Sequence, residues 1–265
     1  RGRRPVLRLR GVPLLMRAPA GHNLAAWLRL RAEESPDRPA LRFITGRGPG
    51  RAPTDNRGAA AALATDNRGA AAALATYAHR TFRQLDLESD AVARGLQRSG
   101  VARGALTILL VRPSRELFVV LFALFKLGAV PVVVDPGMGL DRMLHCYRSV
   151  AAQAFIGIPA AHAVRALRSD SFPALKTLVT VGERAGWGGG TLAELEQPGE
   201  DLSPFPLAEV SADDPLIINF TTGSTGPAKG VEYTHATGQA MLRTIAAHFQ
   251  QDQSDTSLVT LTLLG

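Results

Sequence analysis

The sequence predicts a doubly wound α/β fold, in which helices cover both faces of a mostly parallel sheet. Strand-like apolar runs alternate with helix-length segments from about residue 76 to residue 249. The links between these segments are short, as in doubly wound sheets. Leu106–Val111 and Val130–Val134 are apolar at nearly every position, which is typical of parallel strands covered on both faces.

Composition indicates a globular chain. The 265 residues are 46% hydrophobic and 20% charged, enough for a sizeable core. The net charge of +7 comes from the first 32 residues, which hold eight arginines and no acid, whereas the remainder has 22 basic and 23 acidic residues. A near-neutral body argues against nucleic acid as a partner. The single cysteine, Cys146, excludes an intramolecular disulfide, suits a cytoplasmic protein and is interpreted as a buried apolar residue.

The N-terminus is interpreted as a basic extension over residues 1–22, outside the ordered domain over residues 23–265. Residues 1–15 are arginine-rich and acid-poor, as in a mitochondrial transit peptide. We favour the simpler interpretation that the ordered protein starts later, near Met16. No secretory signal is predicted, because no long apolar segment follows the charges.

The first elements are a helix and two strands. Asn23 is placed to cap a helix over Leu24–Glu34, and the proline-rich residues after it end the helix. Ala40–Ile44 and Thr76–Arg80 are predicted strands. Between them, residues 54–64 read TDNRGAAAALA, and residues 65–75 repeat this sequence without change. Two copies are too few for a solenoid, so residues 45–76 are predicted to be a duplicated alanine-rich loop insertion.

Helices and strands alternate through the rest of the chain. Further helices are expected over Thr81–Arg98, Ser114–Leu127, Arg142–Ser149, Ala160–Arg168 and Thr234–Phe249, and further strands over Ala154–Ile158, Leu175–Val181, Leu216–Phe220, Gly230–Tyr233 and Ser257–Leu264. Residues 182–190 are interpreted as a surface turn, and residues 197–214 as a polar, proline-rich linker. No transmembrane segment is predicted, because Lys126 interrupts the most apolar stretch after nine uncharged residues, whereas a span needs about 20.

One stretch suggests chemistry. Residues 219–230 read NFTTGSTGPAKG, with three glycines, four hydroxyls and one lysine in the last ten positions. Glycines let backbone N–H groups surround an anion, hydroxyls add donors, and lysine adds a positive charge, so a polyphosphate is the best ligand. The stretch is not a Walker A loop, because Ala228 stands where that motif needs its second glycine and Gly230 follows Lys229.

The stretch resembles the phosphate-binding signature of the adenylate-forming (AMP-binding) superfamily. Residues 222–226 and Lys229-Gly230 fit the family pattern, whereas Pro227-Ala228 departs from it. The resemblance covers about residues 24–250. Residues 122–131, 135–137 and 153–159 also resemble the β-lactone synthetases of bacterial olefin biosynthesis and their fatty-acid CoA ligase relatives.

The resemblance implies that a fatty or β-hydroxy fatty acid attacks the α-phosphate of ATP, with Mg²⁺ assisting. A β-hydroxyl of the same substrate, or coenzyme A in the ligase branch, then attacks the activated carbonyl. Lys229 is the expected catalytic point charge, and no metal ligand is assigned. The expected ATP-binding residues are Thr221, Thr222, Gly223, Ser224, Thr225, Gly226, Lys229 and Gly230. For His235, which follows in a helix's first turn, packing or capping is favoured over substrate contact.

Motifs for adenine, ribose and magnesium, and the C-terminal domain with its lysine, have no match in the 265 residues. The chain is therefore interpreted as a truncated portion of such an enzyme, and residues 1–265 alone are expected to make no acyl-adenylate. Two alternatives stay open. One is an inactive remnant that binds nucleotide weakly or not at all, and the other is part of a peptide-synthetase adenylation domain. The sequence does not predict an oligomeric state.

Overall fold

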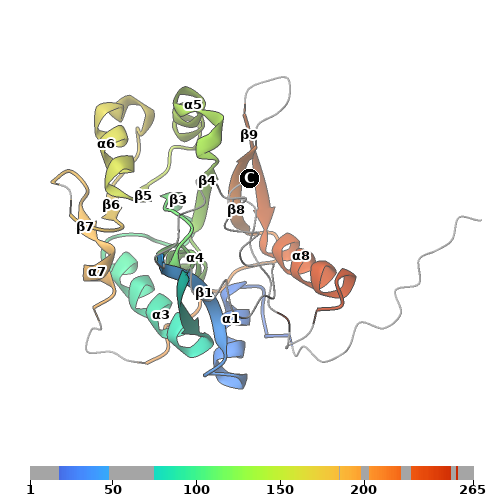
Figure 1. Ribbon diagram of the computed structural model, residues 1–265. Helices are drawn as coiled ribbons and strands as arrows, with labels where there is room; N and C mark the ends of the chain where they lie inside the picture. Colours follow the sequence, from blue (N-terminus) through green and yellow to red (C-terminus); the bar gives the residue numbers. More distant parts are fainter. Residues whose placement is uncertain are drawn as a thin grey trace, which may run out of the picture.

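The computed structural model describes residues 18–47, 75–184, 186–197, 203–221, 228–251 and 255. In this part of the chain, one sheet has the strand order β7-β6-β5-β3-β4-β8-β9, and β1 and β2 form a separate pair. Neighbours in the large sheet are parallel except β8 and β9, which are antiparallel. Helices lie on both faces of the sheet (Figure 1). The predicted doubly wound, mostly parallel fold is confirmed.

Most predicted elements are present within a few residues of their expected bounds. The strands are β1 (Pro39–Arg47), β2 (Ala75–Thr81), β3 (Leu106–Leu110), β4 (Val130–Val134), β5 (Ala154–Gly157), β6 (Thr177–Thr180), β7 (Gly190–Thr191), β8 (Pro215–Thr221) and β9 (Lys229–Thr234). The helices are α1 (Ala25–Glu34), α3 (Phe82–Arg98), α4 (Arg115–Leu127), α5 (Leu140–Val150), α6 (Pro159–Leu167), α7 (Leu192–Leu195) and α8 (His235–His248), with 3-10 turns η1 (Pro136–Met138) and η2 (Ser169–Ser171). The short β7 and α7 were not predicted, and the predicted strand over Ser257–Leu264 lies outside the described residues.

The sheet has a hydrophobic core on each face. Leu96 of α3 and Leu117 of α4 belong to the core on one face, and Leu144 of α5 belongs to the core on the other. β4 is buried at every position, as expected for a central parallel strand. Cys146 is fully buried, as predicted, and burial raises the pKa of its thiol. Across the described ranges, no helix is long and apolar enough to cross a bilayer.

The duplicated segment starts and ends at one place in the fold. β1 and β2 pair antiparallel, from Pro39 opposite Thr81 to Arg47 opposite Ala75. Residues 48–74, which contain most of the repeat, lie outside the described residues. The predicted insertion therefore connects two neighbouring strand ends, and its interpretation as a duplicated loop stays a prediction.

A buried charge cluster joins α1, α3 and α4. Lys126 is fully buried, and its Nζ lies 2.6 Å from carboxylate oxygens of both Asp86 and Asp90. Arg29 of α1 contacts the same two carboxylates at 3.0 and 2.8 Å. Burial lowers the pKa of Lys126, and the two carboxylates oppose that shift. Two cations therefore face two anions, the arrangement that lets charges remain buried.

The same cluster anchors the predicted linker, of which residues 197 and 203–214 are described. The Phe205 N–H donates to Asp90 at 3.1 Å, and the Phe205 carbonyl accepts from two Arg29 nitrogens at 3.2 Å. The carbonyl of Ala208 accepts from Nδ2 of Asn23 at 3.0 Å, while Oδ1 of Asn23 accepts from a backbone N–H at the start of α1. The described part of the linker has no helix or strand, as predicted, but its backbone is fixed against the helices.

Candidate functional site

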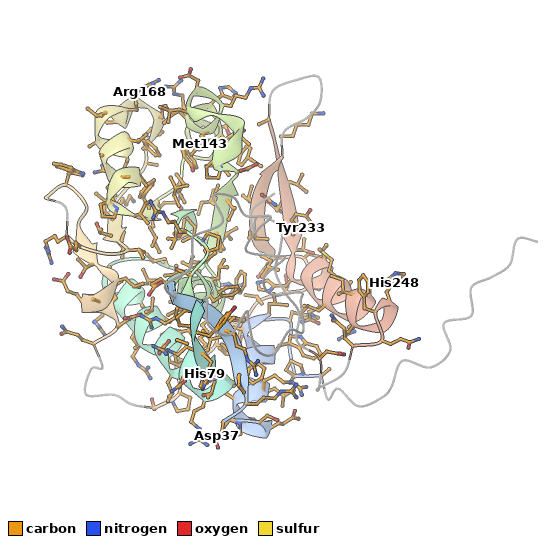
Figure 2. The ribbon with its side chains drawn as sticks, viewed as in Figure 1. Asp37, His79, Met143, Arg168, Tyr233 and His248 are labelled. Carbon is orange, nitrogen blue, oxygen red and sulfur yellow. The ribbon has the colours of Figure 1, made fainter. Side chains whose placement is uncertain are left out.

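The predicted phosphate loop connects two paired strands. Thr221, the last residue of β8, pairs with Lys229, the first residue of β9. The predicted ATP-binding residues between them, Thr222, Gly223, Ser224, Thr225 and Gly226, lie outside the described residues. The structure thus brings Thr221, Lys229 and Gly230 together at the loop end of the β8–β9 hairpin, whereas Tyr233, which is labelled in Figure 2, lies toward its other end.

The hairpin end lies at the edge of the sheet where doubly wound folds bind ligands. β8 is parallel to β4, with Phe220 beside Val134, so both strands end at the same edge. In open α/β sheets, ligands bind outside the carboxyl ends of the strands. The described end of the hairpin therefore lies where this fold favours a binding site.

Lys229 presents a positive charge at the base of the loop. Its side chain is exposed, and within the described ranges it makes no ion pair. The other two lysines differ: Lys126 is buried in the charge cluster, and Lys176 is exposed just before β6, away from the hairpin in the strand order. Lys229 is therefore the lysine whose charge is available to an anion at this site.

Gly230 has a packing role at the hairpin. It lies opposite Phe220 in the antiparallel pair. A Cβ at this position would lie 3.0 Å from Cζ and 3.3 Å from Cε1 of the Phe220 ring. Phe220 is 5% exposed and belongs to the core under α5. The glycine therefore leaves room for a core side chain, a reason that the sequence pattern did not indicate.

We expect Gly230→Ala to lower the free energy of unfolding by about 1 kcal/mol, because its methyl group would lie closer to the buried Phe220 ring than ordinary packing contacts and the ring must shift to make room. Urea denaturation measures the change. Gly186→Ala is the matched control, because a Cβ there meets nothing within 4 Å. Adding Phe220→Leu should recover part of the loss, and a Gly230→Ala protein as stable as wild type would contradict the packing role.

His235 is oriented by the protein interior. Its side chain is 2% exposed, and its Nδ1 accepts a hydrogen bond from the N–H of Leu24 at 3.3 Å. The preceding Thr234 caps α8, since its Oγ1 accepts from the Thr237 N–H at 3.2 Å. These contacts agree with the predicted packing role for His235 and tie the start of α8 to the start of α1.

Burial also sets the charge state of His235. Desolvation lowers its pKa below the usual 6.5, Asp214 opposes this shift, and His22 adds to it. The folded state therefore binds fewer protons than the unfolded state below pH 6.5, so stability falls as pH falls through that region. His162 is also buried, and its Nε2 lies 3.0 Å from the Val179 carbonyl. Burial lowers the pKa of His162 too, so this residue likewise reduces stability as the pH falls.

We expect the unfolding free energy to be lower at pH 5.5 than at pH 7.5, and His235→Asn to reduce this difference. The asparagine oxygen can replace the Nδ1 acceptor without titrating, so the remaining dependence would come from groups such as His162. Urea denaturation at both pH values measures it. An unchanged difference in the variant would show that His235 does not contribute.

The turn before β8 also positions the hairpin. The Asp214 carboxylate accepts from the N–H and Oγ of Ser211 at 3.1 and 2.8 Å, and from Arg103 at 2.8 Å. These bonds lower the pKa of Asp214 to about 2. Its backbone carbonyl accepts from the His235 N–H at 3.1 Å, which links this turn to α8. Sequence reasoning missed it, although a serine three residues before an aspartate is a recognisable turn signal.

The described residues do not form a site that fits a metal ion. Nowhere in the described ranges do three histidine, cysteine, aspartate or glutamate side chains gather closely enough to hold one. The residues that the structure places at the hairpin end instead supply backbone groups and the lysine charge. The arrangement suits an anion.

Comparison with known proteins identifies relatives. The AMP-binding enzyme family matches residues 59–264. The olefin beta-lactone synthetase of Stenotrophomonas maltophilia (strain K279a) is 41% identical over 238 residues, which cover 90% of this chain and 39% of the relative. The olefin beta-lactone synthetase of Xanthomonas campestris pv. campestris is 43% identical over 213 residues, covering 80% of this chain and 34% of the relative.

A solved structure is similar in fold. The long-chain-fatty-acid-CoA ligase FadD1 from Archaeoglobus fulgidus superposes with a TM-score of 0.68 at 18% identity, covering 90% of this chain and 42% of that protein. At this identity the similarity shows the fold alone. The chain spans less than half the length of all three relatives. The family match covers most of the chain, and it therefore belongs to the AMP-binding enzyme family.

Proposed function

We propose that this chain is part of an enzyme that activates a carboxylic acid with ATP. A carboxylate oxygen attacks the α-phosphorus, the bond to the bridging oxygen breaks, and an acyl-adenylate and pyrophosphate form. The observation that carries the proposal is the β8–β9 hairpin, where an exposed Lys229 stands at the base of a loop with a nucleotide-binding signature. The similarity to two olefin beta-lactone synthetases supports it.

The role of the chain's own residues in this step is electrostatic. Negative charge builds on the leaving pyrophosphate, and Lys229 would offset it at close range. The hydroxyls of Thr221, Thr222, Ser224 and Thr225 would donate hydrogen bonds to the phosphates, and the loop glycines would let backbone N–H groups approach. Mg²⁺ would supply further charge neutralisation when bound, but the described residues offer no cluster to hold it. Lys229 is therefore the cation that the described chain contributes.

The acid is proposed to be a fatty acid with a β-hydroxyl group, and the enzyme to act in the cytoplasm. In the second step, the β-hydroxyl oxygen attacks the acyl carbonyl, AMP leaves, and the hydroxyl proton is lost, which closes a four-membered lactone. Coenzyme A is the alternative acceptor, in which case a thioester forms. The names of the two bacterial relatives favour the lactone.

The test uses the full-length gene product that contains this chain. It is incubated with ATP and Mg²⁺ and a 3-hydroxy fatty acid, with and without coenzyme A, and pyrophosphate release is measured. We expect release that depends on the acid but does not require coenzyme A, with a β-lactone as product. A requirement for coenzyme A would support the ligase alternative, and no release with any carboxylic acid would reject the proposed function.

A further inference from the structure

Asn219 of β8 is an unexplained polar residue beside the predicted phosphate loop. Its Oδ1 is buried, and within the described residues it has no hydrogen-bond partner. An unsatisfied buried acceptor destabilises the folded protein. Ile217, which lies two positions earlier on the same face of the strand, packs against the core, so an apolar residue would suit position 219. Residues that break a packing rule in this way are often retained for function.

The strand register places Asn219 on the same face of the hairpin as Lys229. Asn219 lies opposite Val231 in the antiparallel pair, so their side chains share one face. Val231 and Lys229 are two positions apart on β9 and point the same way, with a spacing of about 7 Å along the strand. Lys229 is exposed and Val231 is 38% exposed, so this face is open toward the loop end.

The orientation of the Asn219 carboxamide indicates the kind of ligand. Its acceptor oxygen is enclosed without a partner, whereas its amide nitrogen donates no hydrogen bond within the described residues and is not among the enclosed atoms that lack a partner. The amide N–H groups are therefore the part that a ligand can reach, and they can only donate hydrogen bonds. The nearby Lys229 is a cation without an ion pair in the described ranges. A donor and a cation on one face suit an anion rich in acceptor oxygens.

We infer that Asn219 is a further nucleotide-binding residue, whose amide group donates a hydrogen bond to a phosphate oxygen of ATP. The inference rests on the proposed function and adds a residue to it. In this arrangement the buried Oδ1 is left without a partner because the carboxamide is turned with its nitrogen toward the ligand. If Asn219 is instead a buried polar residue that meets no ligand, replacing it should leave the affinity for ATP unchanged.

The test compares Asn219→Leu with wild type in the full-length gene product, using calorimetry with ATP and with adenosine. We expect ATP affinity to fall about 10-fold, because a hydrogen bond to a charged group is lost, and adenosine affinity to stay unchanged. Urea denaturation should show equal or higher stability, because the unsatisfied oxygen is removed. Ile217→Leu on the same strand is the control and should bind ATP normally.

Asn219→Asp provides a second variant of the same shape. Its negative charge should weaken ATP binding more than leucine does, again without an effect on adenosine. It serves as the test if the leucine variant does not fold. Unchanged ATP affinity in a folded variant, or an equal loss for adenosine, would overturn the inference alone. A wild-type protein that neither binds ATP nor releases pyrophosphate would instead reject the proposed function.

Discussion

Lys229→Ala should slow adenylate formation by about 10²-fold or more in the full-length gene product. The expected loss follows from the position of Lys229 at the base of the loop, where it is the exposed cation that offsets charge on the leaving pyrophosphate. Acid-dependent exchange of labelled pyrophosphate into ATP measures this step directly.

Lys176→Ala is the matched control for that experiment. It removes the same charge from an exposed position before β6, so a general electrostatic effect on a negatively charged substrate would appear in both variants. We expect the exchange rate of Lys176→Ala to stay within a factor of about two of wild type, because an exposed charge away from the site is screened by solvent and salt. Near-normal exchange in Lys229→Ala would remove this lysine from the mechanism.

Lys126→Met should produce the largest loss of stability, about 3–5 kcal/mol. The substitution keeps most of the side-chain volume but leaves two buried carboxylates, Asp86 and Asp90, with Arg29 as their remaining cation. A typical domain is stable by about 5–15 kcal/mol, so the change removes a large share of the total. Urea denaturation measures it, with Lys176→Met as the exposed control.

The double substitution of Lys126→Met with Asp90→Asn separates charge from packing. If the loss arises from an unbalanced charge, removing one carboxylate should recover part of it, so the two changes will not be additive. If Lys126→Met alone costs less than about 1 kcal/mol, the cluster does not act as a buried ion network. Full additivity would indicate that lost packing is the cause.

The sequence predicted those parts of the fold that depend on local signals. Thr81 and Gln84 form the capping box at the start of α3, with hydrogen bonds of 3.2 and 3.0 Å, and Gly128 ends α4 with a φ of +66°. Such signals involve residues that are close in the chain. The apolar runs that became β3 and β4 are equally local, because burial on both faces removes the alternation of polar residues.

The missed features depend on contacts between distant residues. Lys126 was recognised as a charge that interrupts an apolar stretch, but its partners are 36 and 40 residues away, so no periodic pattern identified them. The hydrogen bond from Phe205 to Asp90 joins residues that are 115 positions apart, so the attachment of the linker to the helices was not predicted. At the site, the composition of the sequence identified the loop. The unsatisfied carboxamide of Asn219 and its place on the same face as Lys229 required the structure.

The pairing of β1 with β2 has a consequence for how the gene can vary. Because Arg47 and Ala75 are held opposite each other, the two ends of the chain between them are fixed side by side. The entropy of closing a flexible loop grows only logarithmically, by about 0.6 kcal/mol for each doubling of its length. Versions of the chain with one, two or three copies of the TDNRGAAAALA unit should therefore differ in their free energy of unfolding by only about 1 kcal/mol or less.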